Sequence, residues 1–196
     1  INDRDGIDWL VREHQPDIVI HLASFPRQKV VNSNPQLGSQ TMSEGLLSLL
    51  EAAKKNKVKK FVYVSSSMVY GDSQDDVRED FNCKPQGQYG IMKLMGEHLV
   101  KDYTRRNYFD NVIIRPSAVY GELDVEDRVV SKFMLAAMRG ETIRVNGSTE
   151  VLDFTHVEDA AQGIVLAATS STAVSKTYNV TRNAAKPVSL LDAAAL

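Results

Sequence analysis

Tyr89, Lys93 and Ser66 are the residues of this chain whose types and spacing could carry out chemistry. Lys93 follows Tyr89 by four residues, about one helical turn, so the phenol and the ammonium would share one helix face. Ser66 stands 23 residues before Tyr89, in the strand-like run 61–67. Such a pair beside a strand end could lower the pKa of the phenol from roughly 10. The spacing therefore predicts that Tyr89 transfers a proton.

The same pair, taken alone, also fits a surface tyrosine that stacks beside a lysine on an amphipathic helix. The flanking sequence favours the chemical interpretation, because strand-like and helix-like patterns alternate around the pair. Strands are predicted at 18–23, 60–66, 111–116, 142–146 and 177–180, and helices at 7–15, 34–54, 87–106, 127–138, 157–168 and 189–196. The unbroken apolar run 18–23 indicates a strand buried on both faces. This alternation predicts an α/β fold with a parallel sheet, which binds ligands at the carboxyl ends of its strands, where Ser66 and Ser117 lie.

Composition excludes several classes of protein. The 196 residues are 43% hydrophobic and 24% charged with a net charge of −2, which gives no long-range attraction for nucleic acid. A single cysteine, Cys83, allows no disulfide within the chain and favours a cytoplasmic location. No apolar run reaches the length of a membrane span. No metal site is expected, because His21, His98 and His156 are widely separated in the sequence. The sequence contains no Gly-x-Ser-x-Gly elbow, so it does not support a hydrolase.

Five motifs follow one another in a characteristic order. They are His21-Leu22-Ala23-Ser24, Ser65-Ser66-Ser67-Met68-Val69-Tyr70-Gly71, Tyr89-Gly90-Ile91-Met92-Lys93, Arg115-Pro116-Ser117-Ala118-Val119-Tyr120-Gly121 and Asp153-Phe154-Thr155-His156-Val157-Glu158-Asp159. The series resembles the extended short-chain dehydrogenase/reductase superfamily, and within it the nucleotide-sugar epimerase/dehydratase branch. The resemblance implies a Rossmann-like, doubly wound parallel sheet, incomplete in this chain, with part of a small C-terminal substrate-binding domain.

The resemblance also implies roles for the residues of these motifs. Tyr89 would take the proton of a sugar hydroxyl, Lys93 would bind the nicotinamide ribose and keep the tyrosine acidic, and Ser66 would hydrogen-bond the reacting oxygen. Contacts to a bound NAD or NADP are expected from Leu22, Ala23, Ser24, Ser65, Tyr89, Lys93 and Pro116. Substrate contacts are expected from Ser67, Met68, Ser117, Ala118 and Arg128.

Departures from the family pattern refine the expected substrate and reaction. Dehydratases of the family carry acidic residues where this chain has Ser67 and Met68, which favours epimerisation or simple oxidation and reduction of a nucleotide sugar. Family residues that hold the diphosphate are replaced by Ala118 and Leu152. A dehydrogenase of a non-nucleotide alcohol is therefore an alternative.

The Gly-rich turn that would cradle the cofactor pyrophosphate is absent from the sequence. We expect the chain to be part of a longer protein and inactive alone; the other interpretation is a non-catalytic binding or regulatory module. Residues 1–122 are predicted to be the remainder of the cofactor domain, with 153–170 packing back on it, and 123–152 and 171–196 to be part of a substrate-binding region. In similar proteins helices such as 34–54 and 87–106 pair across a homodimer interface, which we expect here.

Overall fold

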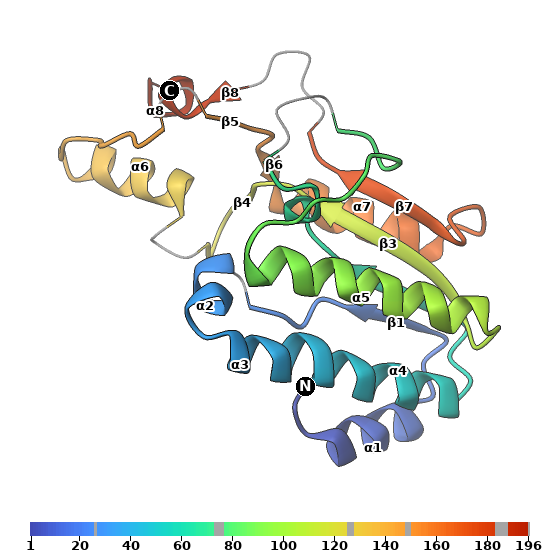
Figure 1. The fold of residues 1–196 in the computed structure, drawn as a ribbon. Helices are drawn as coiled ribbons and strands as arrows, with labels where there is room; N and C mark the ends of the chain where they lie inside the picture. The colour runs from blue at the N-terminus through green and yellow to red at the C-terminus, as the bar shows by residue number, and fades with distance from the viewer. Residues whose placement is uncertain (26, 73–76, 125–127, 148–149, 183–187, 196) are drawn as a thin grey trace. The chain divides into compact units, whose positions relative to one another are not determined.

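The computed structural model describes residues 1–25, 27–72, 77–124, 128–147, 150–182 and 188–195 (Figure 1). Its first compact unit comprises Ile1–Arg115 and Val165–Asn179, and its second comprises Pro116–Ile164 and Val180–Leu196. The assignment of cofactor and substrate binding to separate regions of the chain stays a prediction. No helix in the described ranges is long and apolar enough to cross a membrane.

Helices and strands alternate along the chain as predicted, and the expected α/β class is confirmed. The helical elements are α1 (Arg4–His14), α2 (Gln28–Ser33), α3 (Pro35–Ser39), the π-helical turn η1 (Gln40–Glu44), α4 (Gly45–Lys55), the 3₁₀ turn η2 (Ser67–Tyr70), α5 (Gly87–Arg105), α6 (Val129–Met138), α7 (Val157–Thr169) and α8 (Leu190–Ala195). The strands are β1 (Ile18–His21), β2 (Lys60–Val64), β3 (Asp110–Pro116), β4 (Val119–Tyr120), β5 (Val151–Leu152), β6 (Thr155–His156), β7 (Lys176–Val180) and β8 (Val188–Ser189).

The main sheet has the strand order β1-β2-β3-β7. β1 pairs with β2 in parallel, with Ile18 opposite Lys60, and β2 pairs with β3 in parallel, with Lys60 opposite Asp110. Because these three strands run in one direction, their carboxyl ends meet at one edge of the sheet. Helices α4 and α5 lie beside one another against this sheet (Figure 1). This edge carries the segments that follow His21 and Val64.

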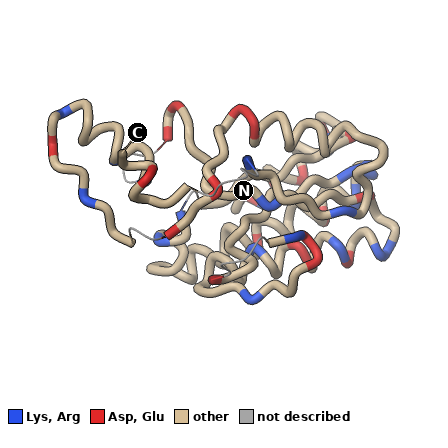
Figure 2. The backbone as a smooth tube through the Cα atoms, turned by 90° about the horizontal axis from the view of Figure 1, so that it is seen from above, with Lys and Arg blue, Asp and Glu red and all other residues tan. Residues whose placement is uncertain are grey.

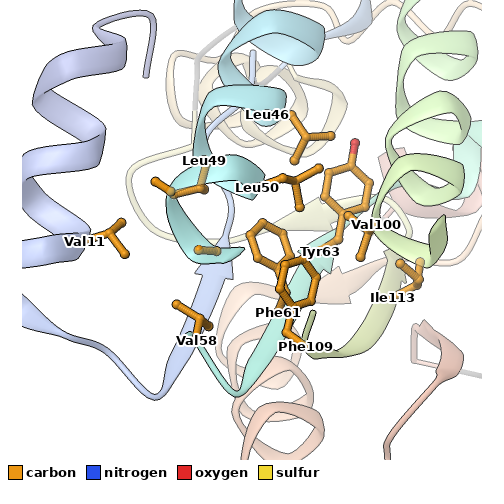
Figure 3. Packing of buried hydrophobic residues seen from close by; sticks show 12 residues of the cluster. Val11, Leu46, Leu49, Leu50, Val58, Phe61, Tyr63, Val100, Phe109 and Ile113 are labelled. Atoms are coloured by element: carbon orange, nitrogen blue, oxygen red, sulfur yellow. The ribbon is translucent and has the colours of Figure 1, made fainter. Parts of the chain in front are cut away.

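The core of the first unit forms where α4 and α5 meet β2. Leu46 and Leu50 of α4 and Val100 of α5 are fully buried against Phe61 and Tyr63 (Figure 3). Burying each of these side chains contributes about 1.5–3 kcal/mol to the free energy of unfolding. The core therefore fixes the position of α5, the helix that carries Tyr89 and Lys93, relative to β2.

A glycine permits the close approach of α5 to this sheet. A Cβ atom at Gly96 would lie 2.2 Å from the hydroxyl oxygen of Tyr63 and 3.1 Å from Leu46. Since Tyr63 is only 2% exposed, its ring has no free space to move into. The small residue thus sets the distance between α5 and β2 one turn beyond Lys93.

Three expectations about local structure were wrong. β1 is not buried on both faces, because Ile18 and Ile20 are each 37% exposed in this chain. The predicted strand at 142–146 is irregular. The predicted single helix 34–54 is interrupted by η1, where buried Met42 occupies a π-helical turn. The predicted homodimer through helices 34–54 and 87–106 stays a prediction.

Charged residues of both signs occur along the described chain (Figure 2). Figure 2 shows Lys and Arg interspersed with Asp and Glu over the described chain. Several of them form surface ion pairs, such as Lys55 with Asp8 at 2.9 Å and Lys59 with Asp17 at 2.9 Å. Exposed pairs of this kind contribute about 0–1 kcal/mol each, so the fold depends chiefly on its apolar core.

Candidate active site

Lys93 is the buried centre of the candidate site. Its side chain is only 4% exposed, and its Nζ donates a 2.8 Å hydrogen bond to the carbonyl oxygen of Val64, the last residue of β2. The same Nζ lies 5.8 Å from the ring centroid of Tyr89 and 5.4 Å from that of Tyr63. Lys93 therefore joins the end of β2 to the helix face that carries Tyr89, as the four-residue spacing predicts.

Burial disfavours the charged form of this lysine. Removal from water lowers the pKa of Lys93 from 10.5 to about 8, and the negative charge of Glu97 partly opposes that effect. At neutral pH the ammonium is still the major form. It places a positive charge, weakly screened by solvent, 5.8 Å from the centroid of the Tyr89 ring.

Tyr63 is the other tyrosine beside Lys93, and its surroundings suit a structural role. It is 2% exposed, and burial, reinforced by the charge of Glu97, raises the pKa of its phenol. Its ring also stacks on His21, with centroids 5.8 Å apart. Burial lowers the pKa of His21 to about 4, so the imidazole is neutral at pH 7. Neither residue is suited to exchange protons with a ligand near neutral pH.

The backbone around Tyr89 is held from a neighbouring helix. Asn32 of α2 accepts a 3.1 Å hydrogen bond from the backbone amide of Tyr89, near the start of α5, where the N-cap residue Gln86 makes no side-chain cap. Gly87, two residues before Tyr89, has φ +70°, a conformation that favours glycine. A Cβ atom at Gly87 would lie 2.7 Å from the Asn32 side chain, so only glycine allows this close approach. The Tyr89 side chain packs against the cluster of Val31, Met42 and Met92. Asn32 thus satisfies one of the unpaired amides of the first turn and fixes its position.

Ser66 lies at the turn that follows β2. Its backbone is extended, and its Oγ accepts a 3.2 Å hydrogen bond from the amide of Met68, which caps η2. Accepting this bond leaves the hydroxyl hydrogen able to donate to another oxygen. A Cβ at Gly90 would lie 2.7 Å from the carbonyl oxygen of Met68, so the turn beginning at Ser66 packs directly on the first turns of α5. The structure therefore brings Ser66, Tyr89 and Lys93 into one region of the first unit.

Other predicted site residues have mixed placements. Leu22 and Ala23 are exposed just after β1, whereas Ser65 is 3% exposed and its Oγ donates to Glu97 at 2.7 Å. A cofactor contact by the Ser65 hydroxyl would compete with that bond and stays a prediction, as do substrate contacts by Ser67 and Met68.

The remaining predicted contacts belong to the second unit, which begins at Pro116. Ala118 accepts a hydrogen bond from the amide of Thr155 and has φ +36°, a left-handed conformation in which asparagine is more common than alanine. Arg128 donates to the carbonyl oxygen of Val119 at 3.0 Å. Substrate roles for Ser117, Ala118 and Arg128, and a cofactor role for Pro116, stay predictions.

Sequence reasoning missed two residues that support this site, Glu97 and Arg115. Both are almost fully buried, and they form an ion pair at 2.7 Å. Arg115 lies in the predicted strand 111–116, and Glu97 follows Lys93 by one turn on the same face of the predicted helix 87–106. A charged residue in an apolar strand requires a partner of opposite charge, and this requirement could have predicted the ion pair from the sequence.

Comparison with known proteins decides the family. The family model described as "NAD dependent epimerase/dehydratase family" matches residues 1–181. The chain belongs to the NAD-dependent epimerase/dehydratase family. This confirms the resemblance inferred from the ordered motifs.

Relatives within this family include both epimerases and dehydratases. The chain is 28% identical over 167 residues to an uncharacterized UDP-glucose epimerase of Bacillus subtilis, covering 84% of this chain and 52% of that protein. It is 27% identical over 194 residues to a dTDP-glucose 4,6-dehydratase of Neisseria gonorrhoeae, covering 92% and 56%. The chain thus spans about half the length of these curated relatives.

A solved structure of similar fold carries a bound cofactor. The UDP-glucose 4-epimerase of Thermus thermophilus, determined as a complex with NAD, superposes with a TM-score of 0.89 at 25% identity. The similarity covers 99% of this chain and 65% of that chain. The expected Rossmann-like class is confirmed by this likeness.

The pKa of Lys93 predicts a dependence of stability on pH. Between about pH 8 and 10.5 the unfolded chain retains a proton that folded Lys93 has lost, so stability rises with pH in this window. We expect the unfolding free energy of the wild type, relative to Lys93→Met, to increase by about 3 kcal/mol across it. Urea unfolding at several pH values measures the difference, with Lys59→Met, which removes an exposed lysine paired with Asp17, as the control that shows no such increase. A flat difference for Lys93→Met would contradict the assigned burial.

Proposed function

We propose that the protein carrying this chain is an NAD(P)-dependent epimerase acting on a nucleotide sugar, with Tyr89 as its acid/base group. The observation that carries the proposal is the buried Lys93, bonded to Val64 at 2.8 Å and lying 5.8 Å from the Tyr89 ring. UDP-glucose is the first substrate to consider, because the relatives of similar fold include UDP-glucose 4-epimerases.

The end of β1 fits a dinucleotide cofactor in its chemistry. Leu22 and Ala23 are exposed there, and Ser24 Oγ is buried without a hydrogen-bond partner among the described residues. A buried hydroxyl lacking a partner costs about 1–3 kcal/mol, which a cofactor oxygen or amide would recover. Leu22, Ala23 and Ser24 would hold the cofactor beside Lys93. NAD(P), when bound, supplies the hydride acceptor for oxidation of a sugar carbon.

Tyr89 would act on the oxygen of that same carbon. As the carbon loses hydride, the hydroxyl loses its proton to the Tyr89 phenolate, which completes the conversion of an alcohol to a carbonyl. The Lys93 ammonium stabilises the phenolate, and the Ser66 hydroxyl donates to the sugar oxygen. Return of hydride to the opposite face of the carbonyl, with the proton returned by Tyr89, would give the epimer.

The proposal favours epimerisation over dehydration because of Ser67 and Met68. Dehydration of a sugar requires a group that removes a proton from carbon and a group that protonates the departing oxygen. Neither a hydroxyl nor a thioether has a suitable pKa at neutral pH. Carboxylates occupy these positions in the family's dehydratases, as the resemblance implies.

Product analysis tests this assignment. The full-length protein is incubated with NAD and either UDP-glucose, UDP-glucuronic acid, dTDP-glucose or a simple polyol, and products are identified by NMR. We expect inversion at one sugar carbon of a nucleotide sugar, without loss of water. A dehydrated keto sugar would replace the epimerase with a dehydratase, and turnover of the polyol alone would indicate a non-nucleotide alcohol dehydrogenase. No conversion by cofactor-loaded protein would favour the non-catalytic module.

A further inference from the structure

A buried ion pair lies directly behind the candidate site. Glu97 of α5 is fully buried, and its carboxylate accepts hydrogen bonds from Arg115 Nε at 2.9 Å and Arg115 Nη2 at 2.7 Å. Its Oε1 also accepts a 2.7 Å bond from Ser65 Oγ. This bidentate arrangement with a third donor satisfies both carboxylate oxygens, which is what a buried charge requires.

The guanidinium of Arg115 extends the network to the segment between η2 and α5. Arg115 Nη1 donates to the Tyr70 hydroxyl at 2.7 Å and to the carbonyl oxygen of Glu79 at 3.2 Å, and the guanidinium carbon lies 4.8 Å from the Tyr70 ring centroid. The Tyr70 hydroxyl in turn donates to Asn179 Oδ1 at 2.7 Å. Both ends of η2 are therefore tied to one charge pair, through Ser65 before it and Tyr70 at its last residue.

The network joins the two elements that must be aligned for chemistry. Ser65 is covalently adjacent to Ser66, so the bond from Ser65 to Glu97 fixes the strand end that carries the candidate hydroxyl donor. Glu97 follows Lys93 by four residues on the buried face of α5, so the same carboxylate fixes the turn beyond the lysine. The Glu97 side chain thus accepts hydrogen bonds both from the segment before Ser66 and from β3.

We propose that Glu97 is a positioning residue of the candidate site, which aligns Ser66 with Lys93 through its bond to Ser65 and places a negative charge on the buried face of α5 that carries Lys93. A catalytic effect of Glu97 rests on the proposed function. The contacts and charges of Glu97 do not depend on that function, and they involve only groups of the first unit. Glu97 acts through Ser65 and Lys93 and need not touch substrate.

The groups around Lys93 determine how its protonation would change if Glu97 lost its charge. Lys93 is faced by Tyr63 from β2, by His21 from β1, and by Tyr89 and Glu97 from its own helix. Tyr63 and His21 are neutral at pH 7, so Glu97 is the anion that favours the ammonium there.

The groups around Glu97 also predict that protonation of Lys93 becomes less favourable when Glu97 loses its charge. It is faced by Arg115 from β3, by Ser65 from the end of β2 and by Lys101, 3.7 Å away on α5. Removing its charge would leave the buried cation Arg115 uncompensated as well. Both effects disfavour protonation of Lys93.

The test is the variant Glu97→Gln in the full-length protein, with the Lys93 side chain titrated by NMR. Glutamine keeps the shape and can still accept from Ser65, but it lacks the charge. We expect the midpoint of Lys93 to fall below its wild-type value of about 8 by about one pH unit or more. The alkaline limb of any pH profile of turnover, where the Lys93 ammonium loses its proton, should move to lower pH as well. Glu51→Gln, which removes an exposed carboxylate paired with Lys54 on α4, should leave Lys93 unchanged.

A second variant tests the alignment without changing a charge. Ser65→Ala removes the hydroxyl that donates to Glu97, and we expect faster hydrogen exchange at the Met68 amide, lower kcat and an unchanged KM. If Glu97→Gln does not fold, these measurements decide. An unchanged Lys93 midpoint in folded Glu97→Gln, or unchanged exchange and kcat in Ser65→Ala, would overturn the proposal. A shifted Lys93 midpoint in a protein that converts no nucleotide sugar would refute the proposed function and leave the positioning role standing.

Discussion

Turnover should fall by about two to four orders of magnitude when Tyr89 is replaced by phenylalanine, because general acid–base catalysis contributes about that much. The substitution removes one oxygen atom and keeps the ring that packs on Val31, Met42 and Met92. The unfolding free energy should therefore change little. Steady-state kinetics of the full-length protein under the proposed reaction, with UDP-glucose as the first substrate, measure the effect, and thermal unfolding checks the fold.

A matched control for this variant is Tyr108→Phe. Tyr108 is 38% exposed and its ring lies near Lys54, so it repeats the combination of a tyrosine and a lysine away from the candidate site. Loss of that hydroxyl should leave kcat and KM unaltered. Equal activity of Tyr89→Phe and wild type would remove the proton-transfer role from Tyr89.

The largest expected effect on stability is that of Arg115→Leu. Arg115 is 3% exposed, and burial by itself would lower the pKa of its guanidinium, but its hydrogen bonds and the charge of Glu97 outweigh burial and raise that pKa. Removing the cation leaves Glu97 buried without its partner, which costs about 3–5 kcal/mol. Denaturant unfolding should show this loss as a lower midpoint with an unchanged slope.

Two further variants separate this mechanism from a general loss of side-chain packing. Arg106→Leu removes an exposed guanidinium, paired with Asp102 at 2.8 Å, and should cost less than about 1 kcal/mol. The double variant Arg115→Leu/Glu97→Leu should recover a large part of the loss, since buried pairs can often be replaced by apolar residues. A double variant less stable than Arg115→Leu would show that the unpaired charge is not the cause.

The alternation of strands and helices was predictable because it depends on short-range patterns. The runs that became β2 and β3 are largely apolar, and α5 was bounded to within a residue by its predicted range 87–106. The spacing of Tyr89 and Lys93 likewise placed both side chains on one face of that helix. Such features follow from backbone geometry alone.

Other features depended on contacts that no local pattern contains. The exposure of Ile18 and Ile20 depends on what covers β1, and the segment 142–146 has strand-like residues but no partner strand in the described chain. The π-helical turn at Met42 is a change of hydrogen bonding within an otherwise helical sequence. The bond from Ser65 to Glu97 joins residues 32 positions apart. Tertiary packing decided each of these.

The central claim is that a sugar carbon is oxidised by NAD(P) while Tyr89 accepts the hydroxyl proton. Its most direct test is single-turnover absorbance of the cofactor-loaded, full-length protein after mixing with the nucleotide sugar, for wild type and Tyr89→Phe. We expect wild type to form reduced nicotinamide rapidly, whereas Tyr89→Phe binds the sugar with similar affinity and forms reduced nicotinamide at least about a hundredfold more slowly. Equal rates in the two proteins, or no reduction of nicotinamide during a turnover that yields epimer, would contradict the central claim.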